Sequence, residues 1–507
     1  MKKRILCLVL VLLTVWAVGA AAEETKVYTM AGYDNTQVRS WDKTALFEEL
    51  NDQKVEGNGD VILHFDFQVY KDNDEWKEVK ASMKAGSPMP DVLFKAGLTS
   101  SECQTMLDNG VLIDLSGYIE SCCPNLNALL QQYPQVREAI TLPGGQIAAL
   151  PYIKPLGTQN YMWINVQWLK NLGLEMPTDR ESFEKVLVAF RDMDPNRNGK
   201  KDEIPLSFLG PFDLKFLGHA YGLIGNDYNI CVEDGQVSFL PLDEDFRPFL
   251  EWCHHLFQEG LLDNDGFITT SDWREKNATG HKEEAVYGII FAPIVHDVVK
   301  NDMASQYAIM MPMMYDGQQV YRDFSGDALR GTFAITSACD DPQAVLRWVD
   351  QLYTPQGYAL VNFGAEGVDY RVDETGRLEY TEKALGNQYF VAQRLLNGAG
   401  TVPGLLCLEY DRKVSDDSVQ KILDEQEVFD THTVMPFPYY TLTSEQSAYI
   451  APMQNRLGSY VDTMMGRFII GDVELNDENY AAFEKALYEE YDVESFVAFW
   501  QQIYEAR

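Results

Sequence analysis

The order of hydrophobic and polar positions predicts alternating strands and helices in the first part of the chain. Residues 26–31 and 61–67 have the short apolar runs of strands, whereas residues 41–50 and 74–85 have apolar positions at helical spacing. Residues 91–94 form a further predicted strand after a proline-rich turn. This β-α-β-α-β order favours an α/β fold with a layered sheet.

The amino-terminal segment predicts export from the cytoplasm. Residues 1–4 carry three positive charges, residues 5–22 carry none, and three alanines at 20–22 precede Glu23. This is the arrangement of a cleaved signal peptide. About 18 apolar residues are also close to the minimum for an uncleaved membrane anchor, but the small residues at the end favour cleavage. Either interpretation places residues 23–507 outside the cytoplasm, in the periplasm, secreted or at the cell surface.

The cysteine pattern predicts neither a disulfide framework nor a lipid anchor. No cysteine follows the small residues at 20–22, so a lipid attached at the cleavage point is not expected. An odd number of scattered cysteines without metal-site spacing predicts buried or unpaired thiols and at most one bridge. These seven are Cys103, Cys122, Cys123, Cys231, Cys253, Cys339 and Cys407.

Composition narrows the classes of partner. The 507 residues contain 41 Lys and Arg against 77 Asp and Glu, a net charge of −36. Loss of the three basic residues in the signal peptide leaves 38 against 77, or −39. Such an acidic chain is a poor partner for nucleic acid or an anionic membrane. Hydrophobic residues make up 46% of the chain, which supplies large cores and excludes general disorder.

A polar loop follows an amphipathic helix in the middle of the chain. The helix has an apolar face at Phe183, Val186, Leu187 and Phe190. We expect a capping box at its start, with Thr178 as the cap and Glu181 reaching back to it.

Residues 194–203 after this helix predict a structural calcium site. Oxygen-bearing side chains occupy loop positions one, three, five, nine and ten, and a glycine at position six permits a sharp turn. Mg²⁺ suits the loop less well because it prefers tighter octahedral shells with water. The expected ligands are Asp194, Asn196, Asn198, the carbonyl of Lys200, Asp202 and Glu203.

The loop differs from the common twelve-residue calcium loop at its end. Position twelve is Pro205, so Glu203 would have to supply the bidentate carboxylate. The alternative is a metal-free turn rich in Asn, Asp and Gly, which are common turn residues. Five oxygen side chains around one glycine favour the metal site.

With its helix, this loop resembles the corresponding segment of the large family 1 extracellular solute-binding proteins of bacterial ABC importers. Further motifs are similar to that family in the same order over about 450 residues, whereas residues 400–507 fit less closely. These motifs are residues 110–119, 142–152, 164–174 and the Phe-Gly-Ala-Glu-Gly-Val-Asp-Tyr stretch 363–370.

The resemblance implies a periplasmic-binding-protein-like fold of class α/β. Two α/β lobes would be joined by a multi-strand hinge, with a helical carboxyl-terminal tail. The first lobe would comprise residues 23–151 and about 332–400. The second would comprise residues 152–331 and about 401–507.

The resemblance further implies a non-enzymatic receptor. A monomer would capture a carbohydrate, by expectation an oligosaccharide, in the cleft between the lobes and deliver it to the membrane permease of an ABC importer. No nucleophile-elbow, Walker or HExxH pattern occurs, and no catalytic residue is assigned. One alternative is a secreted glycoside hydrolase with two carboxylates about 5–10 Å apart. Another is a ligand-sensing surface protein on the same fold, which a neighbouring permease gene would distinguish.

Residues at the expected strand ends are the candidate sugar-binding residues. Ligands of open α/β sheets bind beyond the carboxyl ends of strands. Aromatic rings can pack on the C–H faces of sugars, although the same rings also fill cores. Glu366 would hydrogen-bond sugar hydroxyls or cap a turn. The full set is Tyr33, Asp34, Phe94, Tyr152, Tyr161, Trp163, Trp273, Phe291 and Glu366.

Overall fold

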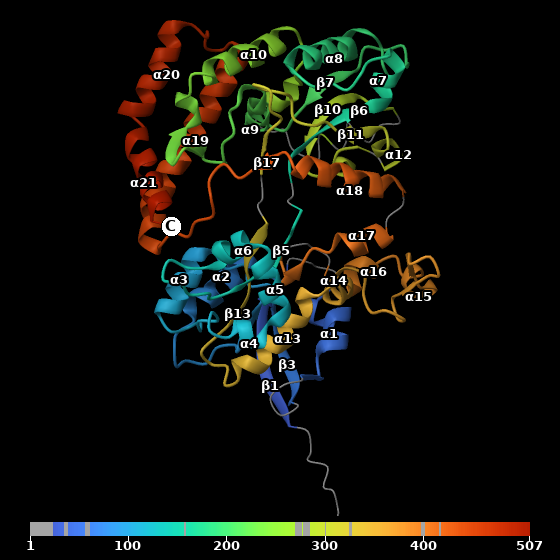
Figure 1. The fold of residues 1–507 in the computed structure, drawn as a ribbon, viewed down its shortest axis with the longest axis vertical. Helices are drawn as coiled ribbons and strands as arrows, with labels where there is room; N and C mark the ends of the chain where they lie inside the picture. Colours follow the sequence, from blue (N-terminus) through green and yellow to red (C-terminus); the bar gives the residue numbers. More distant parts are fainter. Residues whose placement is uncertain are drawn as a thin grey trace, which may run out of the picture.

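Two lobes, each with its own sheet and core, make up the molecule (Figure 1). The computed structural model describes residues 24–34, 39–55, 61–156, 159–268, 276, 284–299, 301–323, 327–396, 401–414 and 417–506. The amino-terminal segment 1–23 with the predicted signal peptide lies outside these residues.

The first lobe is built on a seven-stranded sheet of order β16-β5-β13-β4-β1-β3-β2. Its central strands β1, β3 and β4 run parallel, and β13 runs antiparallel to β4 and β5. The strands are β1 (Thr25–Tyr33), β2 (Gln53–Val55), β3 (Val61–Tyr70), β4 (Val92–Phe94), β5 (Leu150–Ile153), β13 (Ala328–Ile335) and β16 (Gly404–Leu405).

Helices cover this sheet, and a small hairpin of β14 (Tyr370–Val372) and β15 (Leu378–Tyr380) lies beside it. The buried rings of Trp41, Phe47 and Trp348 form the centre of the core. The helices are α1 (Ala45–Leu50), α2 (Asn73–Ser82), α3 (Ser100–Asp108), α4 (Ile119–Cys122), α5 (Pro124–Gln132), α6 (Pro134–Ile140), α13 (Pro342–Asp350), α14 (Pro355–Asn362), α15 (Glu382–Leu385), α16 (Phe390–Arg394) and α17 (Leu408–Val414).

The second lobe is built on a four-stranded sheet of order β11-β6-β10-β7. Two strand pairs, β8 with β9 and β12 with β17, lie outside this sheet. The strands are β6 (Tyr161–Asn165), β7 (Ile204–Ser207), β8 (Ile230–Glu233), β9 (Gln236–Phe239), β10 (Tyr287–Ala292), β11 (Tyr307–Ile309), β12 (Tyr321–Arg322) and β17 (Thr433–Val434).

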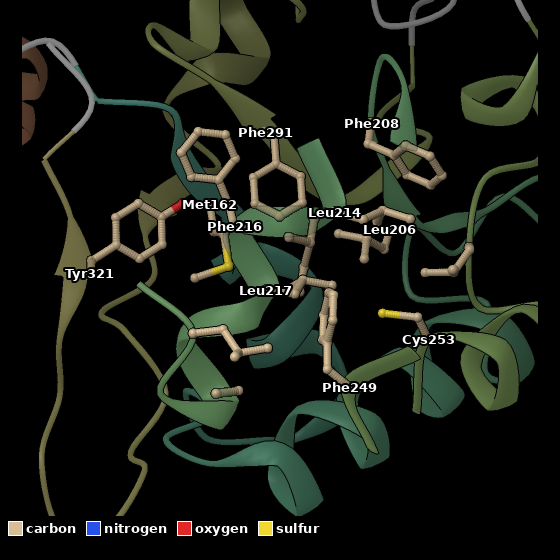
Figure 2. Close-up of a cluster of buried hydrophobic side chains, with 14 of the residues drawn as sticks. Met162, Leu206, Phe208, Leu214, Phe216, Leu217, Phe249, Cys253, Phe291 and Tyr321 are labelled. Carbon is tan, nitrogen blue, oxygen red and sulfur yellow. The ribbon is translucent and has the colours of Figure 1, made fainter. Parts of the chain in front are cut away.

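The core of the second lobe combines residues from the middle and from the end of the chain. Figure 2 shows part of it, with the rings of Phe216, Phe249 and Phe291 turned into one cluster. The surrounding helices are α7 (Val166–Leu172), α8 (Arg180–Asp192), α9 (Pro211–Leu214), α10 (Phe246–Gln258), α12 (Asn301–Ala304), α18 (Asp417–Asp430), α19 (Ser444–Ile470), α20 (Asp477–Glu489) and α21 (Val493–Glu505).

The chain passes between the lobes from β5 to β6, from β12 to β13 and from α17 to α18. We expected the last passage near residue 400. Instead, β16 pairs with β5 and α17 packs on α14, so residues 401–414 lie with the first lobe. The backbone pairing of residues 404 and 405 with β5 decides this placement. No distinctive pattern in the sequence predicts that pairing.

Two further expectations concern local structure. The cap of α8 lies one residue later than predicted, because the side chain of Asp179 accepts from the amide of Ser182 and Ser182 Oγ accepts from the amide of Asp179. The seven cysteines of the described residues are all unpaired, and all but Cys407 are buried. No helix among the described residues has the length and apolar character needed to span a membrane.

Candidate functional site

The strand directions place one edge of each sheet towards the other lobe. Only five residues separate β12 in the second lobe from β13 in the first, so the start of β13 lies close to the second lobe. Because β4 runs antiparallel to β13, and β1 and β3 run parallel to β4, the carboxyl ends of all three lie at this edge. Open α/β sheets bind ligands at such an edge.

Four charged residues gather at this edge of the first lobe, and we call them the strand-end cluster: Asp34, Arg39, Lys71 and Lys95. Asp34 is fully buried after β1. Its Oδ2 lies 3.3 Å from Lys71 Nζ, and its Oδ1 lies 3.9 Å from Lys95 Nζ. Lys71 also donates to the carbonyl of Arg39. Three cations therefore surround one carboxylate.

Burial makes the charged forms of the cations in this cluster less favourable. It lowers the pKa of Lys95 and of Arg39, and the Asp34 carboxylate offsets this effect in part. Sequence reasoning selected Asp34 but missed the three cations. Lys71 and Lys95 directly follow β3 and β4, so the strand-end rule that selected Asp34 also applies to them.

The facing edge of the second lobe is more apolar. Since β6 begins near the passage from β5, and β10 runs antiparallel to β6 and parallel to β7, the carboxyl ends of β7 and β10 lie at this edge. Phe212 follows β7 and is 49% exposed, and Ile294 follows β10 and is 52% exposed. The sequence analysis missed both side chains.

A buried carboxylate anchors the short helix α9, which carries Phe212. Asp213 accepts from the amide of Leu209 and from Asn160 Nδ2, each at 2.8 Å. Its burial raises the pKa of Asp213 to about 6. Asn160 immediately precedes β6, so this contact ties α9 to the passage between the lobes.

Three of the predicted sugar-binding rings lie inside the cores. Phe94 packs against Trp41 with ring centroids 5.3 Å apart. Trp163 donates from Nε1 to the carbonyl of Ala292 at 2.9 Å and has no exposed surface. Phe291 points into the cluster of Figure 2. In this conformation none of the three presents an open ring face.

The other candidates lie in mixed surroundings. Tyr152 and Tyr161 are buried, and their hydroxyl groups have no hydrogen-bond partner among the described residues. Tyr33 is half-buried at the interlobe edge beside Asp34, and Glu366 is exposed between α14 and β14. Trp273 lies outside the described residues. Sugar contact by these residues remains a prediction.

The loop 194–203 has the turn expected of a cation-binding loop. The carboxylate of Asp194 accepts from the amides of Asn198 and Gly199, each at 3.1 Å. Asn198 Oδ1 accepts from the amide of Lys200 at 2.7 Å. Gly199 has φ +74°, the left-handed conformation that glycine adopts without strain. These bonds fold the side chains of Asp194 and Asn198 back onto the loop.

Further carboxylates surround the loop. Glu203 Oε1 is buried and has no hydrogen-bond partner among the described residues. Burial, followed by the carboxylates of Asp202 and Asp194, raises the pKa of Glu203. Glu284, which sequence reasoning missed, accepts from Asn198 Nδ2 at 2.8 Å. An oxygen-rich set with an unpartnered carboxylate fits a hard divalent cation such as Ca²⁺.

The residue types of this donor set matter. The described residues contain no group of three or more His, Cys, Asp or Glu side chains arranged to hold a metal ion. Asp194, Asp202 and Glu203 are of these types, so in this conformation their carboxylates are not gathered closely enough to hold an ion by themselves. The other predicted donors are two asparagine side chains and one backbone carbonyl. The oxygen donors are those that calcium uses.

Comparison with known proteins gives relatives over nearly the whole chain. No protein-family model matches it. The fructooligosaccharide ABC transporter substrate-binding protein FusA of Streptococcus pneumoniae is 27% identical over 480 residues, which cover 90% of this chain and 87% of FusA.

Solved structures are similar over the same extent. FusA in complex with kestose has 24% identity and a TM-score of 0.70, covering 95% of this chain and 99% of FusA. An HMO-binding, ABC-transporter-associated solute-binding protein from Bifidobacterium longum infantis has 19% identity and a TM-score of 0.75, covering 96% of this chain and 99% of that protein. Another FusA structure is of an EF-hand mutant.

These likenesses confirm the expected fold, a periplasmic-binding-protein-like pair of α/β lobes with a helical tail. The relatives are named as substrate-binding proteins, not as enzymes. The resemblance found in the sequence is therefore also confirmed: this chain is similar in sequence and in fold to the solute-binding proteins of oligosaccharide ABC importers.

Proposed function

We propose that this protein is an extracytoplasmic receptor that binds an oligosaccharide between its lobes and delivers it to the permease of an ABC importer. The observation that carries the proposal is the similarity to FusA over 90% of the chain, joined to the two-lobed fold. The same similarity favours a receptor over a secreted hydrolase. The protein would act as a non-catalytic monomer, with residues 1–22 removed as a signal peptide.

Binding would operate by closing the lobes. A ligand shifts the molecule towards the closed state only through contacts that it makes better there than in the open state. The passages between the lobes would absorb the change in backbone angles. Weak polar contacts already join the lobes: Ser444 Oγ lies 3.0 Å from Ser101 Oγ and 2.6 Å from Thr105 Oγ1. Exposed hydroxyl pairs of this kind exchange readily with water.

We assign the sugar to the space between the two facing edges. Phe212 would pack on a C–H face of the sugar, because its ring is half exposed after β7. Tyr33 and Asp34 would lie on the opposite side, after β1. Of the other predicted residues, Tyr152, Tyr161 and Glu366 stay secondary candidates. The buried rings of Phe94, Trp163 and Phe291 would support the edges from within.

Calcium would stabilise the second lobe through the loop 194–203. Asp194, Asn196, Asn198, the Lys200 carbonyl, Asp202 and Glu203 would hold the ion. The loop is attached to β7 through Ile204, so an ordered loop would also fix the strand that leads to Phe212. An EF-hand mutant was made of the relative FusA, which is consistent with a site of this kind.

A thermal-shift screen tests the function. Oligosaccharides that bind only the native state raise the melting temperature, and fructooligosaccharides such as kestose are the first probes. Phe212→Ala should weaken sugar binding by about 1–2 kcal/mol, the scale of a lost aromatic contact, without lowering stability. Tyr488→Ala removes a similarly exposed ring from α20 and should have no effect on binding. Failure of every oligosaccharide class to shift the melting temperature would contradict the proposal.

A further inference from the structure

The strand-end cluster has an excess of positive charge in a strongly acidic protein. Arg39, Lys71 and Lys95 share one carboxylate, Asp34. Residues 35–38, which connect Asp34 to Arg39, are Asn-Thr-Gln-Val and carry no charge. Among the described residues, no carboxylate other than Asp34 acts to raise the pKa of Arg39 or Lys95. Arg39 and Lys95 therefore share this one carboxylate between them.

Arg39 also has unused hydrogen-bond donors. Its Nε and Nη1 atoms are buried, and neither has a hydrogen-bond partner among the described residues. A buried donor without a partner costs about 1–3 kcal/mol, and more when the group is charged. In native proteins a buried donor without a protein partner calls for a specific explanation, such as strain, catalysis, or a bound water or ion that supplies the acceptor.

The backbone at Lys95 adds a second unusual feature. Lys95 has φ +51°, a left-handed conformation that is uncommon for residues other than glycine. It directly follows β4, and its side chain is turned to Asp34 rather than to solvent, with only 7% of it exposed. Strained residues of this kind gather at ligand sites.

From this geometry we propose that the strand-end cluster binds an oxyanion substituent of the sugar, either the carboxylate of a uronic acid or a sulfate ester. The proposal rests on the proposed function and specifies the substrate class. The planar guanidinium of Arg39 matches two oxygens of such a group at once. Lys71 and Lys95 add charge from adjacent strand ends, at the edge where open α/β sheets bind ligands.

Calorimetric titration of the full chain tests this assignment with matched sugars. Trigalacturonate and its methyl ester have the same sugar backbone, but only the former carries negative charge. A sulfated trisaccharide distinguishes sulfate from carboxylate. Kestose serves as a neutral sugar of the same length. The anionic probe with the preferred substituent should bind at least tenfold more tightly than the neutral ones. Its affinity should fall as salt increases, because salt screens charge interactions.

Substitutions test whether the strand-end cluster causes the preference for anionic sugars. Arg39→Gln should weaken binding of the anionic sugar about 10- to 100-fold, the range for losing a hydrogen bond to a charged group. Arg39→Lys keeps the positive charge but lacks the planar pair of guanidinium donors. It should therefore bind the anionic sugar more tightly than Arg39→Gln and less tightly than the unchanged protein. Lys77→Gln removes an exposed cation from α2, outside the cluster, and should change nothing. The melting temperature of each variant checks that it folds.

The outcomes separate the two proposals. If neutral sugars bind as tightly as the anionic ones and Arg39→Gln binds both unchanged, the anionic-substrate assignment is overturned and the oligosaccharide receptor stands. If only the methyl ester of trigalacturonate or kestose binds, the anionic-substrate assignment is overturned in the same way. If no sugar of either class binds, the receptor function itself fails.

Discussion

The loop 194–203 and the strand-end cluster both concentrate charge, but the chain assembles them differently. The loop gathers three carboxylates and two asparagine side chains within ten consecutive residues, whereas the cluster gathers three cations and one carboxylate from residues 34, 39, 71 and 95. The first arrangement can be recognised as a motif. The second exists only because β1, β3 and β4 lie side by side in one sheet. A group of polar side chains thus indicates a ligand in both places, but only the loop can be recognised from the sequence alone.

Asp34 is the only carboxylate of the strand-end cluster, and its removal should have the largest effect on stability. Asp34→Asn leaves three cations without their shared partner, and breaking a buried ion pair in this way costs about 3–5 kcal/mol. We expect urea unfolding to show a loss of that size. Asp74→Asn removes an exposed carboxylate from α2 and should change stability by less than about 1 kcal/mol. An unaffected Asp34→Asn variant would mean that the cluster is solvated rather than buried.

The corresponding experiment on the loop is to add or remove calcium. At 100 times its dissociation constant, calcium should stabilise the protein by about 2.7 kcal/mol, because it binds only the folded loop. Chelation should reverse this gain, and magnesium should restore it poorly. Asp194→Ala should abolish the response, whereas Asp192→Ala, at the end of α8, should keep it. If the protein contains no metal and its melting temperature is the same with and without chelator, residues 194–203 form a turn that binds no calcium.

The charge at Lys95 predicts a pH dependence. Burial lowers the pKa of Lys95 below its ordinary 10.5, so the folded protein holds this proton less tightly than the unfolded chain does. Stability should therefore rise as the pH increases towards 10.5, where the unfolded chain also loses the proton. Lys95→Met should lack this rise. The difference between the two pH profiles of unfolding is the measurement, and parallel profiles would count against a buried ammonium group.

The smallest expected effect distinguishes between Glu203 and Glu284 as the bidentate calcium ligand. Glu203→Gln should abolish high-affinity calcium binding, because its carboxylate is the predicted bidentate ligand. Glu284 contacts Asn198 but is half exposed, so Glu284→Gln should weaken calcium binding by about tenfold at most, the lower range for a supporting residue. The reverse order of effects, measured by competition with a calcium chelator, would assign the bidentate role to Glu284.

Local signals in the sequence predicted much of the fold. The strands predicted at 26–31 and 61–67 are β1 and β3, each three residues longer than predicted. The cap of α8 was misplaced because Thr178 and Asp179 are both good capping residues, and the choice between them depends on Ser182. Element type follows from periodicity, but the exact ends depend on contacts that periodicity does not contain.

The candidate site was harder to predict because burial depends on tertiary packing. Phe94 and Phe212 both follow or end strands, yet Phe94 is fully buried against Trp41 and Phe212 is half exposed. No local pattern distinguishes the two rings. The cations of the strand-end cluster were missed for a related reason, since their proximity depends on strand order rather than on spacing along the chain.

The interleaving of the lobes has a consequence for how the protein is made. The core of the second lobe places Tyr161 and Tyr321 against Phe429, with ring centroids 5.1 and 5.0 Å away, and Trp500 belongs to the same core. During synthesis the ring of Tyr161 is thus ready long before its partner emerges. The second lobe cannot be completed by a nascent chain that stops short of α18–α21, whereas the first lobe needs the chain only as far as α17. An exported chain of this design gains from staying unfolded until its last helices have been synthesised.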